Sequence, residues 1–254
     1  MNIEYITCSG ISFNNDIEDI IDLGKKYPRA EFAIQATPSS FYNGAQKYEW
    51  FDTLLSSCKV NNTKLAMHLN AEYCKGLCSY GVVPYSLRRL WEIKRNNGTP
   101  VIGRVQVNIN GVKGDFEFRA DKVAEVINHF SNIKFIFQYT PAQHNRILDL
   151  HEQKVPFALL QDYSGGKGEE AGFWIQPVFP DHPMGYAGGL SPKNVFDKLN
   201  EINEILPMDY STWIDAEGKL KSPDSNGEKV FDVALAEKYI ERAYRWQVLN
   251  GYQR

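Results

Sequence analysis

Two side chains with reactive chemistry lie at the ends of short apolar segments. Cys8 ends the segment Ile3–Cys8, and Asp162 ends the segment Pro156–Asp162. A thiol can act as a base or nucleophile if its pKa is lowered, and a carboxyl group that emerges from an apolar segment can keep its proton and act as a general acid. Each residue also has a structural interpretation, because cysteine is often a small buried hydrophobic residue and aspartate often caps a turn.

Glycine-rich turns follow two of the apolar segments. Gly165 and Gly166 come soon after Asp162, and Gly188 and Gly189 precede a serine–proline pair of the kind that begins a helix. Such turns expose backbone N–H groups that can bind a phosphate group. The alternative is a tight turn that needs glycine only for its backbone conformation.

Other polar residues end further apolar segments. Asp215 and Glu217 place negative charge close to the expected phosphate site, and Lys219 offsets part of it. His68 also ends a segment, although a lone histidine is more often a structural residue. Five neutral amides could line a pocket or cap loops: Gln35, Asn70, Gln106, Asn108 and Gln138. The histidines and cysteines match no metal-binding spacing, so we expect no metal and no cofactor.

Eight short segments rich in apolar and β-branched residues are typical of buried parallel strands. They are Ile3–Cys8, Glu31–Ala36, Lys64–Leu69, Ile102–Asn108, Ile133–Tyr139, Pro156–Asp162, Met184–Ala187 and Ser211–Asp215. Amphipathic stretches typical of helices lie between most of them. These are Asp16–Lys26, Gln46–Ser57, Tyr85–Arg95, Ala120–Phe130, Ala142–Gln153 and Pro192–Ile205, with Asp232–Leu249 after the last strand.

This alternation predicts a (β/α)8 TIM barrel. The chain has 254 residues, so eight repeats have about 32 residues each, the size of a βα unit in a closed barrel. No linker divides the chain, so we expect one domain over residues 1–254. An open doubly wound sheet is the alternative, but no glycine-rich dinucleotide fingerprint follows the first strand. Because barrel active sites lie at the C-terminal ends of the strands, the polar residues above are expected at one mouth, under a long loop after Asp162.

Composition narrows the class of protein. The formal net charge is −3, with no basic surplus that would indicate nucleic-acid binding. The start of the chain lacks the pattern of a signal peptide, and no apolar run is long enough to span a membrane. We therefore expect a cytoplasmic protein with reduced cysteines and a small-molecule substrate; the oligomeric state is left open.

Several of these segments together resemble phosphoribosylanthranilate isomerase, a (β/α)8 enzyme of tryptophan biosynthesis. The matching segments follow the order of that family: Thr7–Gly10, Asp162 with Gly165–Gly168, Ala187–Val195, Ile214–Gly218 and Lys229–Asp232. The most specific is Ala187–Val195, which reads Ala-Gly-Gly-Leu-Ser-Pro-Lys-Asn-Val.

The resemblance implies an isomerase that performs an Amadori rearrangement of an N-linked ribose phosphate. Asp162 would protonate the furanose ring oxygen, and Cys8 would remove the proton from the sugar C2. Backbone N–H groups of Gly188, Gly189 and Gly218 would hold the phosphate. Together with Gly165, Gly166 and Asp215, these glycines complete the expected substrate site.

The chain also departs from the family pattern. Ile6 stands where the family has a lysine, the segment 38–42 lacks the family's substrate-contacting arginine, and Glu217 replaces a serine. Two fewer positive charges and one more carboxylate favour a less charged substrate. A divergent barrel acting on another sugar or carbonyl compound is therefore the first alternative. A barrel that binds a small molecule without catalysis is the second. No lysine ends a predicted strand, which disfavours Schiff-base chemistry.

Overall fold

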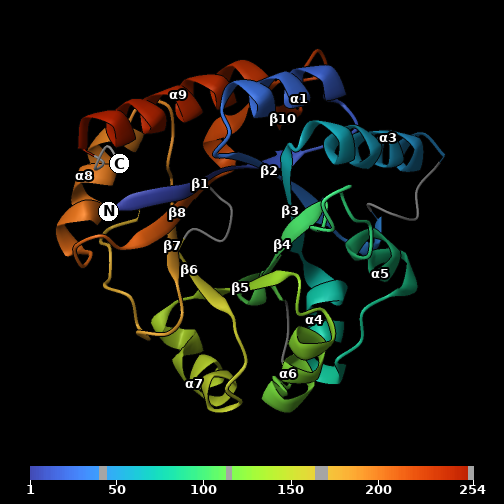
Figure 1. Ribbon diagram of the computed structural model, residues 1–254, viewed down its shortest axis with the longest axis vertical. Coiled ribbons are helices and arrows are strands. Elements are labelled where there is room, and N and C mark those ends of the chain that lie inside the picture. Colours follow the sequence, from blue (N-terminus) through green and yellow to red (C-terminus); the bar gives the residue numbers. More distant parts are fainter. Residues whose placement is uncertain (40–44, 113–115, 164–170, 251–254) are drawn as a thin grey trace.

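Eight parallel strands close into a barrel, as the sequence predicted, with every strand hydrogen-bonded to the next and the eighth to the first (Figure 1). The computed structural model describes residues 1–39, 45–112, 116–163 and 171–250. The strands are β1 (Asn2–Ile11), β2 (Ala30–Ala36), β3 (Lys64–Leu69), β4 (Ile102–Val107), β5 (Lys134–Tyr139), β6 (Ala158–Asp162), β7 (Met184–Ala187) and β8 (Ser211–Ala216). All eight predicted strands are confirmed, and together they form a single (β/α)8 domain.

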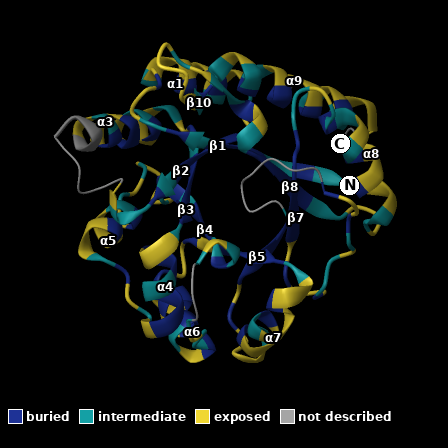
Figure 2. Ribbon diagram, turned by 180° about the vertical axis from the view of Figure 1, so that it is seen from behind, coloured by how far each residue is buried: buried dark blue, intermediate teal, exposed yellow. Residues whose placement is uncertain are grey.

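Helices surround the barrel, and Figure 2 shows buried residues on the strands and exposed residues on the outer faces of the helices. They are α1 (Ile17–Lys26), α3 (Ala45–Asn61), α4 (Ala71–Tyr80), α5 (Tyr85–Trp91), α6 (Ala120–His129), α7 (His144–Glu152), α8 (Val195–Ile205) and α9 (Val233–Asn250). A small hairpin, β9 (Lys221–Pro223) with β10 (Lys229–Phe231), follows β8. In the described part of the chain, no helix is long and apolar enough to cross a membrane.

Three helices differ from the prediction. The sequence did not predict α4, which is followed by Gly81 in the left-handed conformation (φ +65°) that favours glycine. The predicted helix over Tyr85–Arg95 ends at Trp91. The helix predicted to begin at Pro192 begins at Val195 instead, because the Ser191 hydroxyl and amide both donate to the Asn194 side chain in a turn.

Side chains on alternate positions of each strand point into the barrel, which is filled rather than hollow. Gly185 of β7 shows how tightly the barrel interior is packed, because a Cβ there would lie 2.1 Å from the indole ring of Trp213 on β8. Trp213 is 2% exposed. Glycine at this position therefore makes room for a large side chain from the neighbouring strand.

A polar cluster lies in the middle of the barrel; we call Thr7, Glu31 and Arg104 the lower cluster. Arg104 Nη2 donates to Glu31 Oε2 at 2.5 Å and to Thr7 Oγ1 at 2.9 Å. The Thr7 hydroxyl in turn donates to Glu31 Oε2 at 3.0 Å. The guanidinium carbon lies 4.1 Å from the Tyr5 ring centroid and 4.9 Å from that of Trp213. The buried charges are thus neutralised within the protein.

Candidate functional site

A cavity of about 350 Å³ opens above the lower cluster, at the C-terminal ends of the strands. Seven strands or the residues directly after them contribute to its wall, from β2 round to β8. The five amides that the sequence indicated as pocket residues all line it: Gln35, Asn70, Gln106, Asn108 and Gln138. The wall is therefore rich in neutral groups that can both donate and accept hydrogen bonds.

Asp215, at the end of β8, is the most strongly perturbed acid of the cavity. The Ser9 hydroxyl donates to its Oδ1 at 2.6 Å, and His68 Nε2 lies 3.7 Å from its Oδ2. Burial raises the pKa of Asp215 to about 8; the Ser9 hydrogen bond opposes this rise, and the charges of Glu217 and Asp162 add to it. Asp215 therefore keeps its proton at neutral pH and can serve as an acid.

His68, at the end of β3, lines the cavity next to this acid. Burial lowers the pKa of His68 to about 3, and the positive charge of Arg104 adds to the effect. The imidazole is therefore neutral at physiological pH. It offers a polar partner to Asp215 without supplying a compensating charge.

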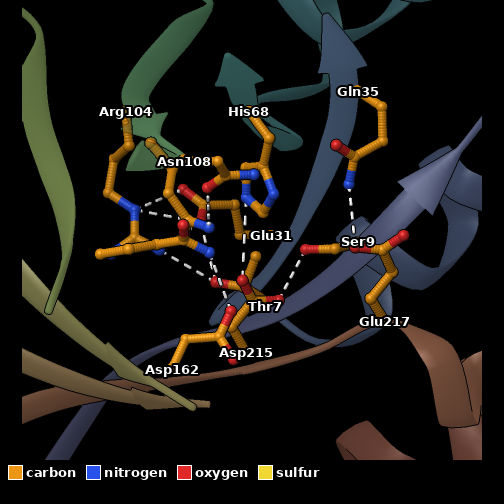
Figure 3. Close-up of polar contacts among 12 residues, drawn as sticks. Thr7, Ser9, Glu31, Gln35, His68, Arg104, Asn108, Asp162, Asp215 and Glu217 are labelled. Atoms are coloured by element: carbon orange, nitrogen blue, oxygen red, sulfur yellow. Dashed lines mark hydrogen bonds and ion pairs between the residues drawn. The ribbon is translucent and has the colours of Figure 1, made fainter. Parts of the chain in front are cut away.

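Asp162 ends β6 and lines the same cavity, 5% exposed. Gln138 Nε2 donates to its Oδ2 at 2.9 Å, and Asn110 Nδ2 donates to its backbone carbonyl at 3.4 Å. Asp162 and Asp215 both line this cavity (Figure 3), and the charge of Asp162 acts on the pKa of Asp215. The cavity thus contains two neighbouring carboxyl groups, one of them oriented by an amide.

Glu217 follows β8 and is part of the cavity wall, but both its oxygens have partners. Lys221 Nζ donates to Oε1 at 2.7 Å, and Gln35 Nε2 donates to Oε2 at 3.0 Å. Lys221 therefore offsets the negative charge that the sequence placed near the expected phosphate site. Lys219 also lines the cavity.

The predicted glycine sites are placed in part. Gly188, Gly189 and Gly218 line the cavity, and Gly188 and Gly189 have φ values of +133° and +64°. A Cβ on Gly188 would lie 3.0 Å from the Cβ of Ala171, so glycine also allows the loop before β7 to pack closely. Gly165 and Gly166 lie outside the described residues. Phosphate binding by these glycines stays a prediction.

Cys8 is not in the cavity wall, which corrects the expectation that its thiol faces the mouth. It is fully buried in the core of strands and surrounding helices, and its charge acts on the pKa of Tyr239 in α9. Burial raises the pKa of Cys8 well above its usual value, and the charges of Asp215 and Glu31 add to the rise. On β1 it is Thr7 and Ser9 that point inward, so the alternation of the strand turns Cys8 outward.

Sequence reasoning did not select Ser9, although its signal was available. Thr7 and Ser9 stand two residues apart in β1 and are the polar members of an alternating pattern, which is typical of one strand face. The described residues contain no group of three or more His, Cys, Asp or Glu side chains that could hold a metal ion.

No family model and no curated protein sequence matches the chain. Among solved structures, phosphoribosyl anthranilate isomerase from Thermococcus kodakaraensis is similar, with a TM-score of 0.50, 13% identity, and coverage of 95% of this chain and 99% of that one. N-acetylneuraminic acid synthetase from Leptospira borgpetersenii has a TM-score of 0.55 and 11% identity, covering 100% and 87%. A glycoside hydrolase family 30 xylanase from Clostridium acetobutylicum has a TM-score of 0.51 and 11% identity, with coverage of 95% of this chain and 72% of that one. At these identities the likeness establishes the TIM-barrel fold, which enzymes of different chemistry share.

Proposed function

We propose that the protein is an acid–base enzyme that isomerises a small sugar-like substrate by moving protons between its oxygen and carbon atoms. One observation supports this more than any other: two neighbouring buried carboxyl groups, Asp162 and Asp215, face one cavity whose wall is rich in amides. Proton transfer needs an acid and a base within reach of the same substrate, and amides suit a ligand with many hydroxyl groups.

The environments of the two carboxyl groups divide the roles. Asp215 holds its proton at neutral pH and can give it to the ring oxygen of an N-linked or hemiacetal sugar while the C1–O bond breaks. Asp162 then accepts the proton from C2, and the released electron pair forms an enol. Asp162 returns this proton to C1 while the enol hydroxyl gives its proton to Asp215, so the ketone forms at C2 and both carboxyl groups regain their starting states. Gln138, which donates to Asp162 Oδ2, holds the base in position. The rearrangement needs no external oxidant or reductant.

This assignment differs from the pairing that the sequence resemblance implied. In the proposed reaction Asp162 acts as the base, Asp215 replaces it as the acid, and Cys8 has no role. The Amadori rearrangement of a ribose phosphate is the named form of the proposal. Gly188, Gly189, Gly218 and Lys219 would hold the phosphate at the side of the cavity opposite the amides. The likeness to solved isomerase structures concerns the fold and adds no support for the substrate.

The test follows transfer of deuterium from solvent to substrate carbon. Purified protein in D₂O is mixed with phosphoribosylanthranilate, or with aldoses and their phosphates, and NMR follows deuterium at C1 of the ketose product and at C2 of recovered substrate. Asp162→Asn and Asp215→Asn should each lower the rate by about 10²- to 10⁴-fold. Asp149→Asn, on the exposed face of α7, is the matched control and should leave the rate unchanged. Absence of exchange with every substrate at high enzyme concentration would refute the proposal and favour a binding protein.

A further inference from the structure

Four amide side chains of the cavity wall form one continuous hydrogen-bonded series, which we call the amide chain. Gln106 Nε2 donates to Asn108 Oδ1 at 2.8 Å, and Asn108 Nδ2 donates to Asn70 Oδ1 at 2.7 Å. Asn70 Nδ2 then donates to Gln35 Oε1 at 2.5 Å. The series crosses β4, β3 and β2, so it covers one whole side of the barrel mouth.

The amide chain ends on an ion pair. Gln35 Nε2 donates to Glu217 Oε2 at 3.0 Å, and Lys221 Nζ donates to Glu217 Oε1 at 2.7 Å. The dashed line from Gln35 to Glu217 in Figure 3 marks this last step. An ionised carboxylate can only accept hydrogen bonds, whereas every amide can donate at one end and accept at the other.

The carboxylate therefore decides which way every amide points. Because Glu217 accepts, Gln35 must turn its NH₂ group toward it and its carbonyl oxygen toward Asn70. Asn70 must then turn its NH₂ group toward Gln35, and the same requirement passes to Asn108 and Gln106. A second contact, from Asn70 Nδ2 to the His68 carbonyl at 3.3 Å, favours the same direction.

We propose that Glu217 is a positioning residue that fixes the direction of the amide chain, and that the ordered wall selects the vicinal hydroxyl groups of a neutral sugar. Both N–H groups of Asn70 are used, by Gln35 and by the His68 carbonyl. Gln35, Asn108 and Gln106 each retain a second N–H group after the chain is formed, and the amide oxygens retain second lone pairs, so neighbouring hydroxyls can meet both donors and acceptors. The amide chain itself has no net charge. The positioning role of Glu217 does not depend on catalysis, whereas the choice of a sugar as ligand rests on the function proposed above.

Lys221 makes the proposal sharply testable. In Glu217→Gln, the lysine can only donate, so it would hold the new amide by its oxygen and turn its NH₂ group toward Gln35. Gln35 would then have to present its carbonyl oxygen, and the reversal would pass through Asn70 and Asn108 to Gln106. In Lys221→Met the carboxylate still accepts from Gln35, so the direction should be kept.

The first experiment uses the ligand-free protein and therefore does not depend on activity. Side-chain NH₂ resonances are recorded for ¹⁵N-labelled wild-type protein, Glu217→Gln and Lys221→Met. Glu228→Gln, an exposed glutamate of the same hairpin region, is the matched control. We expect the NH₂ signals of all four amides to move in Glu217→Gln and to stay in place beyond Gln35 in the other two variants. A change in Glu217→Gln that stops at Gln35 would overturn the proposal.

The second experiment tests the ligand class with D-ribose, 2-deoxy-D-ribose and inorganic phosphate as probes. D-Ribose should shift the four NH₂ signals, and its affinity should fall by about tenfold in Glu217→Gln, the equivalent of one hydrogen bond. 2-Deoxy-D-ribose should bind more weakly than D-ribose to the wild type. If every probe shifts only the backbone N–H signals of Gly188, Gly189 and Gly218, the proposal that the amide chain selects sugar hydroxyl groups is refuted.

The two proposals can fail separately. If no substrate exchanges deuterium but the four signals move together and D-ribose binds, the amide chain orders the wall of a sugar-binding protein. If exchange occurs but Glu217→Gln changes only Gln35, the enzyme stands and the positioning role of Glu217 is wrong.

Discussion

Two polar clusters inside the same barrel solve the problem of buried charge in opposite ways. In the lower cluster, the Glu31 carboxylate is bound by the Arg104 guanidinium and the Thr7 hydroxyl, and two aromatic rings cover the cation. At the mouth, Asp215 has the Ser9 hydroxyl and the neutral His68 imidazole as partners, and we call these three residues the mouth cluster. The first carboxyl group is compensated within the protein, and the second remains an acid with a pKa of about 8.

The difference identifies the part of the barrel that is built for a ligand. The Arg104 guanidinium supplies the counter-charge of the Glu31 carboxylate, although its buried Nη1 has no hydrogen-bond partner among the described residues. The charge of this pair therefore needs no ligand to neutralise it, and we assign the pair a structural role. A buried carboxyl group with a raised pKa at the wall of a cavity is the arrangement that enzymes use for acid catalysis. Both clusters draw on β1, through Thr7 and Ser9, two residues apart.

Breaking the lower cluster should give the largest effect on stability. Glu31→Ala leaves the buried guanidinium of Arg104 without its counter-charge, so we expect a loss of about 3–5 kcal/mol in the free energy of unfolding. Urea denaturation measures it. The double variant Glu31→Gln with Arg104→Met should recover much of this loss, because neither charge remains. A loss below 1 kcal/mol in the single variant would contradict the structural role of the cluster.

The mouth cluster should appear in the pH dependence of stability. The pKa of Asp215 is about 8 in the folded protein and roughly 3.9 when unfolded, so between these values the native state holds an extra proton and stability falls as pH rises. His68 acts in the opposite sense, because its folded pKa of about 3 lies below its unfolded value of roughly 6.5. The two effects oppose each other up to about pH 6.5, and above it Asp215 acts alone.

Stability should therefore fall by about 1.5 kcal/mol between pH 6.5 and pH 8, because the slope is at most roughly 1.4 kcal/mol per pH unit and halves at the pKa of Asp215. Asp215→Asn has no proton to lose and should be flat over the same range. Asp149→Asn, which changes an exposed carboxylate, should keep the wild-type slope. Urea denaturation at three pH values measures all three proteins. An equal slope in Asp215→Asn would show that another group causes the fall.

Much of this architecture could be predicted from the sequence, because it depends on the periodicity of apolar residues along the chain. The eight strands are runs of apolar and β-branched residues, and the closed barrel follows from their number and spacing. Placement of Asp162, Asp215 and the five amides at the mouth follows from the rule that barrel sites lie at strand ends. These inferences depend on periodicity, which local sequence contains.

The features that sequence reasoning missed depend on direction and on partners from distant strands. Ser9 and Cys8 are consecutive residues of β1 and therefore face opposite sides of the strand, Ser9 toward the interior of the barrel and Cys8 toward the core between strands and helices. The ion pair that neutralises Glu217 needs Lys221, whose role depends on the fold of the β9–β10 hairpin. The pKa of Asp215 reflects its burial among side chains from several strands, which no local pattern records.

Ser9→Ala should have a smaller effect, on the pKa of Asp215 in the mouth cluster. The Ser9 hydrogen bond lowers the pKa of Asp215, so its removal should raise that pKa further, by up to roughly one unit. Titration of the Asp215 carboxyl carbon by ¹³C NMR measures the shift. Thr7→Val, a change of similar size on the same strand face, is the comparison and should move the Asp215 titration less. An unchanged pKa in Ser9→Ala would mean that the Ser9 hydrogen bond does not oppose the effect of burial on Asp215.

Cys8 lies between Thr7 and Ser9 in the chain and on the opposite face of β1, so it tests whether the mouth cluster is complete without a thiol. Cys8→Ala should leave deuterium exchange and D-ribose binding unchanged and cost about 1 kcal/mol of stability, a typical value for a small change in a core. Iodoacetamide should not inactivate the native wild-type protein, because the thiol is fully buried and its pKa is raised. If Cys8→Ala folds normally but loses exchange, the thiol reaches the substrate in a conformation different from this one, and the Cys8–Asp162 pair implied by the family resemblance would replace the pair of carboxyl groups.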